Sequence, residues 1–242
     1  MCGRFSQAYT WGEIYDFSQP LTVPAEPARN QQARYNIGPT TLIDIIVKTP
    51  AGREIWKVRW GLIPPWHKGT AKQIKPHINS RIEAVDTNGL FKRAYVKNRC
   101  IIPASGFYEW TTEANGDKTP HYISAKDGTI LAFAGIWERW RDENGEEIIS
   151  ASIITRDADR FMESIHNRMP AMLHPDDFDA WLDGTAGKEI LMRPPPELRE
   201  WIVSRRMNKT GFGDDDPATT AAQVEPEVSP PPAEPPPQGS LF

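Results

Sequence analysis

The chain has 242 residues, of which 39% are hydrophobic, and its formal net charge is −4. A chain of this size can bury one substantial core, and a second full domain is not expected. It has no apolar run of about 18 residues, and its start lacks the basic and then apolar stretches of a secretory signal. We therefore expect a cytoplasmic protein that is monomeric and has no membrane partner.

The acidic residues are concentrated at the C-terminal end. After Gly213 the chain carries six acidic residues and no Lys or Arg, so residues 1–213 hold 28 basic residues against 26 acidic ones. Beyond that point it is mostly Pro, Glu, Ala and Thr, with almost nothing apolar to bury. The sequence thus predicts one folded domain over residues 1–213 and a disordered, acidic, Pro-rich tail over residues 214–242. The nearly neutral domain permits a local basic groove without requiring one.

In chain order, the first local signal is the capping-box spacing of Thr10 and Glu13, which predicts the start of a short helix. Asn-Gly or Asp-Gly pairs at 115–116, 127–128 and 144–145 predict hairpin turns. Strands are predicted at residues 42–47, 54–60, 99–103, 106–111, 121–125, 130–137, 147–155 and 201–204, and helices at residues 88–97, 157–164 and 176–182. This order indicates an α+β fold, with an antiparallel, partly barrel-like mixed β-sheet core and short surrounding helices.

Cys2 is the first residue whose chemistry stands out. Removal of Met1 exposes an amine and a thiol on adjacent carbons, with reference pKa values of about 7.7–8.0 and about 8.5. Such an aminothiol forms a Schiff base with an aldehyde and then closes to a thiazolidine ring. Taken by itself, a cysteine at position 2 is more simply explained by chance. The second cysteine, Cys100, lies in an apolar run and is expected to be a buried small hydrophobe, so no disulfide framework is predicted.

Glu109 and His166 are polar residues in surroundings that favour a function. Strand alternation puts Glu109 on the same face as Phe107, and a carboxylate on an apolar face has a raised pKa that suits a general acid or base. His166 follows a predicted helix, where the chain turns. Each also has a structural explanation, as an exposed edge-strand Glu and as a capping or surface His. The other four histidines show no metal-ligand spacing, so neither a metal nor a cofactor is expected.

Arginine and aromatic residues accompany these motifs. Arginines suit bidentate contacts with phosphate, and aromatic faces suit stacking with unpaired bases. The residues in question are Arg4, Arg34, Arg81, Arg168, Tyr35, Trp60, Trp66 and Trp110. Because a chain with nine Trp uses most of them in its core, these residues alone do not indicate a nucleic-acid partner.

Taken together, these segments resemble the SOS-response-associated peptidase (SRAP) family of abasic-site-processing proteins. The matching segments are residues 1–5, 34–40, 60–66, 79–83, 100–110 and 166–170, followed by Val203, Ser204 and Asn208. Six segments in the expected order, with Cys directly after the initiator Met, make the resemblance highly specific. It covers residues 1 to about 208 and leaves the acidic tail outside.

The resemblance implies a covalent chemistry. In the family, the mature N-terminal Cys attacks the ring-opened aldehyde of an abasic deoxyribose in single-stranded DNA, and the thiazolidine crosslink that forms protects the lesion. By match, Cys2 is the nucleophile and Asn79 orients its end and the sugar. Glu109 matches the acid/base of imine formation and crosslink reversal. His166 matches the residue that assists sugar ring opening and stabilises the imine.

The resemblance also implies how DNA is held and where the protein acts. Arg4, Arg81 and Arg168 match contacts to the DNA backbone phosphates, and Trp66 lies in a loop that could guide the strand. The family name records a proposed autopeptidase activity, although only Met1 precedes the cysteine here. Lyase-type Schiff-base chemistry at the nucleoid, near replication forks and during the SOS response, is the implied setting.

Two other functions stay open at this point. An N-terminal-nucleophile hydrolase would use the same Cys2, with His166 or Glu109 nearby, to cleave a peptide or amide bond. A non-catalytic module that binds single-stranded DNA would use the aromatics and arginines and would not depend on Cys2.

The last five residues form a separate motif. Gln238, Leu241 and Phe242 resemble the Gln-x-x-Leu-Phe peptide by which bacterial repair proteins dock on the replication sliding clamp. Leu241 and Phe242 would fill an apolar pocket while the tail acts as a tether. The alternative is a plain solubilising end.

We predict that deletion of residues 238–242 abolishes pull-down of the sliding clamp but leaves crosslinking to abasic DNA in vitro unchanged. The deletion removes the docking side chains and no part of the predicted domain. Pull-down with purified clamp measures the first effect, and clamp binding that survives the deletion would contradict the prediction.

Overall fold

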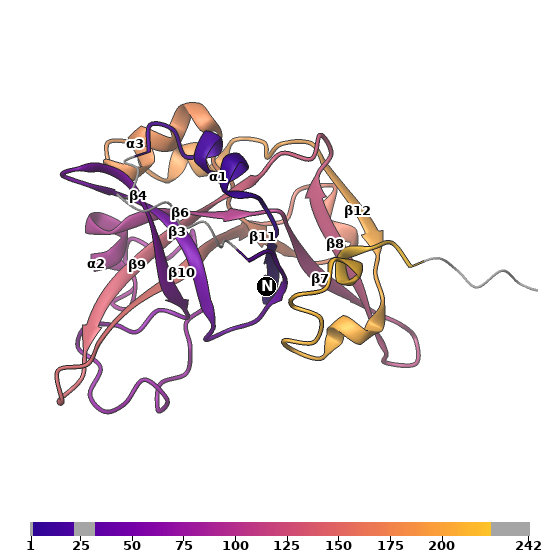
Figure 1. Cartoon of the computed structure of the whole chain (residues 1–242), viewed down its shortest axis with the longest axis horizontal. Helices are drawn as coiled ribbons and strands as arrows, with labels where there is room; N and C mark the ends of the chain where they lie inside the picture. The colour runs from indigo at the N-terminus through magenta and orange to yellow at the C-terminus, as the bar shows by residue number, and fades with distance from the viewer. Residues whose placement is uncertain (1, 22–31, 224–242) are drawn as a thin grey trace, which may run out of the picture.

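The computed structural model describes residues 2–21 and 32–223 and contains two β-sheets (Figure 1). The first sheet has five strands in the order β12-β8-β7-β1-β2. Their bounds are Arg4–Gln7 (β1), Arg34–Ile37 (β2), Gly106–Thr112 (β7), Lys118–Ala125 (β8) and Leu198–Ile202 (β12). Their mutual pairings are all antiparallel, so β1 lies between β2 and β7 in this sheet.

The second sheet closes on itself. It contains β3 (Leu42–Thr49), β4 (Gly52–Trp60), β6 (Arg99–Ala104), β9 (Leu131–Arg141) and β10 (Glu147–Asp157). Strand β10 pairs antiparallel with β9 and parallel with β4, which joins the two ends of the path β4-β3-β6-β9 into a mixed barrel. Two short strands, β5 (Asn79–Arg81) and β11 (Arg168–Pro170), extend the sheet from β10. The predicted α+β fold with a partly barrel-like sheet is confirmed.

The helices are short and follow the local signals. Helix α1 (Trp11–Phe17) begins with the reciprocal capping box of Thr10 and Glu13. Helices α2 (Lys92–Lys97) and α3 (Phe178–Leu182) fall inside predicted helical segments, and α1 and α3 lie along one edge of the molecule (Figure 1). No helix in the described parts of the chain is long and apolar enough to cross a membrane.

The helix predicted at residues 157–164 is wrong. Strand β10 continues to Asp157, which pairs with Arg168 of β11, and only the single 3-10 turn η1 (Met162–Ser164) is helical. The ladder between β10 and β11 supplies backbone hydrogen bonds that a local helix cannot provide at the same residues, so tertiary pairing overrides local propensity.

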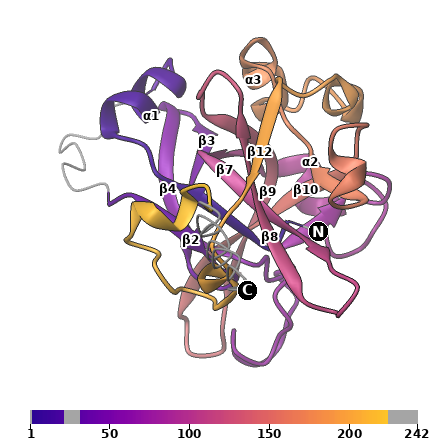
Figure 2. The ribbon, with the colours of Figure 1, turned by 90° about the vertical axis from the view of Figure 1, so that its right-hand side faces the viewer.

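The predicted start of the tail also differs from the structure. Residues 214–223 lie against the five-stranded sheet and include the 3-10 turn η5 (Pro217–Thr220), and Figure 2 shows this C-terminal stretch beside β2. The Asp214 carboxylate binds Arg34 at 2.7 Å, and its carbonyl accepts from the Tyr35 amide at 2.7 Å. The acids at this point therefore serve as anchors. Residues 224–242, which include Gln238, Leu241 and Phe242, lie outside the described part of the chain.

An aromatic cluster fixes β1 in the core. Phe5 is fully buried and meets Trp60 edge-on at a centroid distance of 4.9 Å, with Phe133 at 6.2 Å. Trp60 belongs to the barrel and Phe5 to the five-stranded sheet, so this contact packs the two sheets together.

We predict that Phe5→Ala lowers the free energy of unfolding by about 3–5 kcal/mol, because it leaves a cavity between the two sheets. Phe161→Ala is the matched control, since Phe161 is 38% exposed and its truncation should change stability by no more than about 0.5 kcal/mol. Urea denaturation measures both. Equal losses for the two variants would contradict this account of the core.

Candidate active site

Cys2 lies at the start of β1 and is fully buried. Its Sγ is 3.7 Å from the carbonyl oxygen of Arg4, a weak S–H···O contact. Burial raises the pKa of the thiol, and the charge of Glu109 raises it further. The thiol is therefore held protonated while it is enclosed, and Glu109 is close enough to act on it electrostatically.

Asn79 reaches Cys2 from the barrel. It begins β5, which runs parallel to β10 with Asn79 opposite Ile153. Its Nδ2 donates to the carbonyl of Cys2 at 2.8 Å. Its Oδ1 is buried and has no hydrogen-bond partner among the described residues. A buried acceptor beside the chain end can receive a hydrogen from an amine or a sugar hydroxyl.

Glu109 lies on β7, opposite His121 of β8, and is 3% exposed. Burial raises the pKa of its carboxyl to about 7, and the charge of the chain's amino terminus partly offsets this effect. Both protonation states are therefore populated near neutral pH, which suits a group that gives and takes protons. The sequence prediction of a carboxyl with a raised pKa is confirmed.

His166 lies between η1 and β11 and is half-buried. Its Nδ1 is 2.9 Å from the amide nitrogen of Arg168 and 3.2 Å from the carbonyl oxygen of the same residue. The shorter contact requires Nδ1 to accept, which favours the tautomer that carries its proton on Nε2. Burial, followed by the charge of the amino terminus, lowers the pKa of His166. A neutral ring with a donor at Nε2 results.

These four residues come from both sheets and meet at the amino-terminal end of the chain. Cys2 and Glu109 belong to the five-stranded sheet, whereas Asn79 and His166 belong to strands or loops attached to β10 of the barrel. The hydrogen bond from Asn79 to Cys2 joins the two groups. Glu109 and His166 both respond to the charge of the amino terminus.

Arg4 is hydrogen-bonded inside the protein. The side chain is buried, and Nη1 donates to Asn36 Oδ1 at 2.7 Å and to the Met207 carbonyl at 2.8 Å. Nη2 donates to the Asn208 carbonyl at 3.0 Å and to Thr210 Oγ1 at 2.6 Å. Because each terminal nitrogen has two internal acceptors, Arg4 anchors the C-terminal segment, and its contact with DNA phosphate stays a prediction.

The Arg168 side chain is also hydrogen-bonded within the protein. It forms a two-pronged contact with Glu83 at 2.7 and 3.0 Å, pairs with Asp157 and donates to the Thr155 carbonyl at 2.8 Å. Only 7% of the residue is exposed. These contacts hold β11, and with it the segment that follows His166, against β10. The phosphate contact expected of Arg168 stays a prediction.

Arg81 and Trp66 remain on the surface. Arg81 is exposed on β5, two residues after Asn79, and Trp66 is 63% exposed in the loop that leads to β5. Trp60, in contrast, is fully buried and donates its indole N–H to the Ile78 carbonyl, so it offers no face for stacking.

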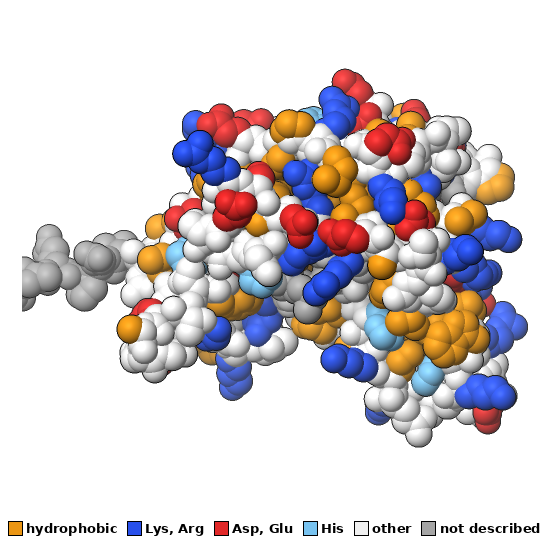
Figure 3. Space-filling view, turned by 180° about the vertical axis from the view of Figure 1, so that it is seen from behind, with side chains coloured by type: hydrophobic (Ala, Val, Ile, Leu, Met, Phe, Trp, Pro, Cys, Tyr) orange, Lys and Arg blue, Asp and Glu red, His pale blue; other side chains and the backbone are white. Residues whose placement is uncertain are grey.

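Two hollows lie away from Cys2. One of about 520 Å³ is lined by Trp66, Lys68 and Arg141, among others, and a larger one of about 770 Å³ lies beside Trp140 and Arg59. Acidic and basic side chains lie next to one another in the middle of the face shown in Figure 3. Within the described residues, no group of three or more His, Cys, Asp or Glu could hold a metal ion.

Asn36 is the polar residue that the sequence reasoning missed. It is fully buried on β2, accepts from Arg4, and donates its Nδ2 to the carbonyls of Met207, Lys209 and Phe212. A lone Asn between Tyr35 and Ile37 in a predicted family segment was the available signal. The three carbonyls to which it donates lie more than 170 residues away in sequence, so they could not be inferred.

The geometry agrees with a comparison against known families, in which residues 1–210 match the family described as SOS response associated peptidase (SRAP). The chain belongs to the SRAP family. The SRAP match ends within the C-terminal segment that Arg4 and Asn36 bind, so that segment is largely part of the family's domain.

Two curated proteins match this chain over similar lengths. The abasic site processing protein YoaM of Bacillus subtilis is 37% identical over 186 residues, which is 76% of this chain and 79% of that protein. The abasic site processing protein YedK of Escherichia coli is 30% identical over 195 residues, which is 78% of this chain and 83% of that protein.

A solved structure has the same SRAP fold. A protein of Bacteroides thetaiotaomicron superposes with a TM-score of 0.76 at 25% identity, covering 92% of this chain and 100% of that one. The fold assigned from the strand order is thus shared with a crystal structure.

We predict that Glu109 makes stability fall as pH rises. Its folded pKa of about 7 lies above its ordinary value of 4.5, so the folded state binds more protons in that window. The contribution of Glu109 to the free energy of unfolding therefore decreases between pH 4.5 and about 7, and Glu109→Gln should remove this part of the slope. Urea denaturation at several pH values measures it.

Glu113→Gln is the control for this measurement. Hydrogen bonds from Thr119 and Arg205 lower the pKa of Glu113, so its contribution to stability changes only below its ordinary pKa. The wild-type slope above that value should persist in this variant. A slope that also persists in Glu109→Gln would contradict the raised pKa of Glu109.

Proposed function

We propose that this chain processes abasic sites in single-stranded DNA by covalent capture through Cys2. The observation that carries the proposal is the hydrogen bond of Asn79 to Cys2, beside a buried Glu109 whose pKa is about 7. Relatives named abasic site processing proteins support the substrate. The family name supports peptidase chemistry as the alternative.

The proposal requires removal of Met1. In the full sequence the nitrogen of Cys2 is part of a peptide bond and cannot form an imine. Hydrolysis of that bond gives a free amine, with a reference pKa of about 7.7–8.0, next to the thiol.

The covalent steps use each nucleophile in turn. The amine of Cys2 adds to the aldehyde carbon, and loss of water gives the imine. The thiol sulfur then bonds to the imine carbon, and a proton is delivered to the imine nitrogen, which closes the thiazolidine ring. One water molecule is released overall. Because burial keeps the thiol protonated, the amine reacts first.

Glu109 moves the protons in these steps. With a pKa of about 7, its carboxyl can protonate the departing hydroxyl, and its carboxylate can accept the thiol proton. Reversal of the crosslink uses the same group in the opposite direction. The neutral His166, with a donor at Nε2, is suited to hydrogen-bond the sugar oxygen as the ring opens.

Arg81 and Trp66 are the proposed contacts to the DNA strand. Both are exposed: Arg81 is on β5, two residues after Asn79, and Trp66 is in the loop that precedes β5. An arginine can pair with phosphate and an exposed indole can stack on an unpaired base. They would orient the lesion toward Cys2 without taking part in the chemistry.

We predict that the purified protein, incubated with single-stranded DNA carrying one abasic site, gives a slow-migrating covalent band on a denaturing gel. Cys2→Ala should abolish the band, because it removes the thiol that closes the ring. Cys100→Ala is the matched control, since Cys100 is equally buried but lies on β6, and its band should persist. Undamaged DNA should give no band.

Two other results would overturn the proposal. If intact-mass analysis shows that Met1 is removed and no band forms, while an amide substrate is cleaved with dependence on Cys2, the protein is an N-terminal-nucleophile hydrolase. If Cys2→Ala binds abasic DNA and retains every measured activity, the protein is a non-catalytic binding module.

A further inference from the structure

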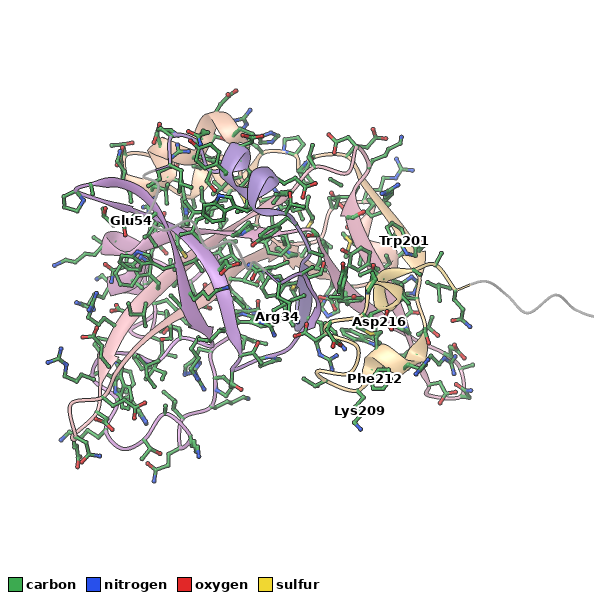
Figure 4. The ribbon with its side chains drawn as sticks, in the orientation of Figure 1. Arg34, Glu54, Trp201, Lys209, Phe212 and Asp216 are labelled. Carbon is green, nitrogen blue, oxygen red and sulfur yellow. The ribbon has the colours of Figure 1, made fainter. Side chains whose placement is uncertain are left out.

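A C-terminal strap crosses the five-stranded sheet near the site. The strap is defined here as residues 205–214, which contain the 3-10 turn η4 (Arg205–Asn208). It is fastened to β2 by Asn36 and by the pairing of Arg34 with Asp214. Figure 4 shows Lys209 and Phe212 on this segment, with Arg34 beside it.

Asn208 of the strap is hydrogen-bonded to three strands, and its Nδ2 donates to the Lys118 carbonyl of β8 at 3.2 Å. Its backbone carbonyl accepts from Arg4 Nη2 at 3.0 Å, and its side-chain Oδ1 accepts from Trp110 Nε1 at 2.7 Å. Arg4 lies two residues after Cys2, and Trp110 directly follows Glu109. One residue therefore links the strand that carries the proposed nucleophile to the strand that carries the proposed acid/base.

The link through Asn208 lies at the end of the ladder between β1 and β7. The pairing of β1 with β7 begins at Arg4, which lies opposite Tyr108, so Cys2 and Gly3 are beyond the last paired residue. An unpaired chain end frays unless other contacts hold it. The Arg4 carbonyl also contacts Cys2 Sγ, so a shift of Arg4 is passed on to the thiol.

We propose that Asn208 is a positioning residue that fixes Cys2 relative to Glu109 through Arg4 and Trp110. The proposal rests on the covalent capture by Cys2 described above. Asn208 touches neither the DNA nor the reacting atoms in this scheme. It limits the relative movement of β1 and β7, so that the thiol and the carboxyl stay within reach of one imine carbon.

The test uses two variants that cut the same hydrogen bond from opposite sides. Trp110→Phe removes the indole N–H and leaves the other contacts of Asn208 in place. Asn208→Ala removes the acceptor and also the Nδ2 donor to Lys118, while it keeps the backbone carbonyl that binds Arg4. Asn208→Asp retains an oxygen for the indole and serves as the conservative variant. Trp201→Phe is the matched control, because the Trp201 indole also donates to the C-terminal segment, to Thr220 at 2.7 Å, away from the site.

Single-turnover crosslinking to abasic single-stranded DNA is measured over a range of DNA concentrations. We expect the rate constant at saturating DNA to fall roughly 10-fold in Trp110→Phe and Asn208→Ala. Their dissociation constants for undamaged DNA should be unchanged. Asn208→Asp should recover most of the rate, and Trp201→Phe should react like the wild type.

Other outcomes would overturn the inference. Wild-type rates in both Trp110→Phe and Asn208→Ala would show that the link is only structural. Equal rate loss in Trp201→Phe would point to general loosening of the C-terminal segment. Weaker DNA binding with an unchanged saturated rate would make Trp110 a stacking surface. Absence of crosslinking by the wild type would instead overturn the proposed function itself, so the two failures are distinguishable.

Discussion

The hydrogen bond from the Asn79 amide to the Cys2 carbonyl joins the start of β1 to the barrel, and the arrangement of the site depends on it. The two sheets also meet through the hydrogen bonds of Gln7 with Asp44 and Pro103 and through apolar contacts such as Phe5 against Trp60, which lie further along β1 than Cys2. The directional hydrogen bond from Asn79 sets the orientation of the chain end at Cys2 relative to the barrel. Residues from β5 and from the segment before β11 thereby face residues from β1 and β7.

Burial gives the site its acid–base character. Glu109 has its pKa raised because the packing of β7 in the core removes water from its carboxyl, and the pKa of His166 is lowered for the same reason. The two opposite shifts give the site a carboxyl that titrates near neutral pH and an imidazole that stays neutral there. This arrangement lowers the free energy of unfolding, since a buried carboxyl opposes folding once it is ionised.

The local features of the fold could be predicted from the sequence. The capping box of Thr10 and Glu13, the Gly turns and the alternation that buries Glu109 all depend on neighbouring residues, and the structure has each of them. The family segments were sufficient to select Cys2, Asn79, Glu109 and His166 as candidates. Their roles in catalysis remain proposals.

What the sequence could not supply depends on distant partners. The contacts of Arg4 with the C-terminal segment could not be inferred because those acceptors lie more than 200 residues away, and the pairing of Arg168 with Glu83 spans 85 residues. The acids after Gly213 looked like a solvated tail because Arg34, the partner of Asp214, is 180 residues away. Strand pairing with β11 likewise replaced the helix expected after residue 157. The local composition of a segment shows its charge. Whether a charged side chain is buried, and with which residue it pairs, depends on the folded chain.

The full burial of Cys2 has a practical consequence for anyone who prepares this protein. Because the proposed reaction needs the free amine of Cys2, a purification handle fused ahead of this buried residue would keep that amine acylated. A handle placed after Gln223 starts beyond the last described contact of the C-terminal segment, the bond from the Gln223 amide to Ile202. Expression vectors for this chain should therefore carry their handle at the carboxyl end.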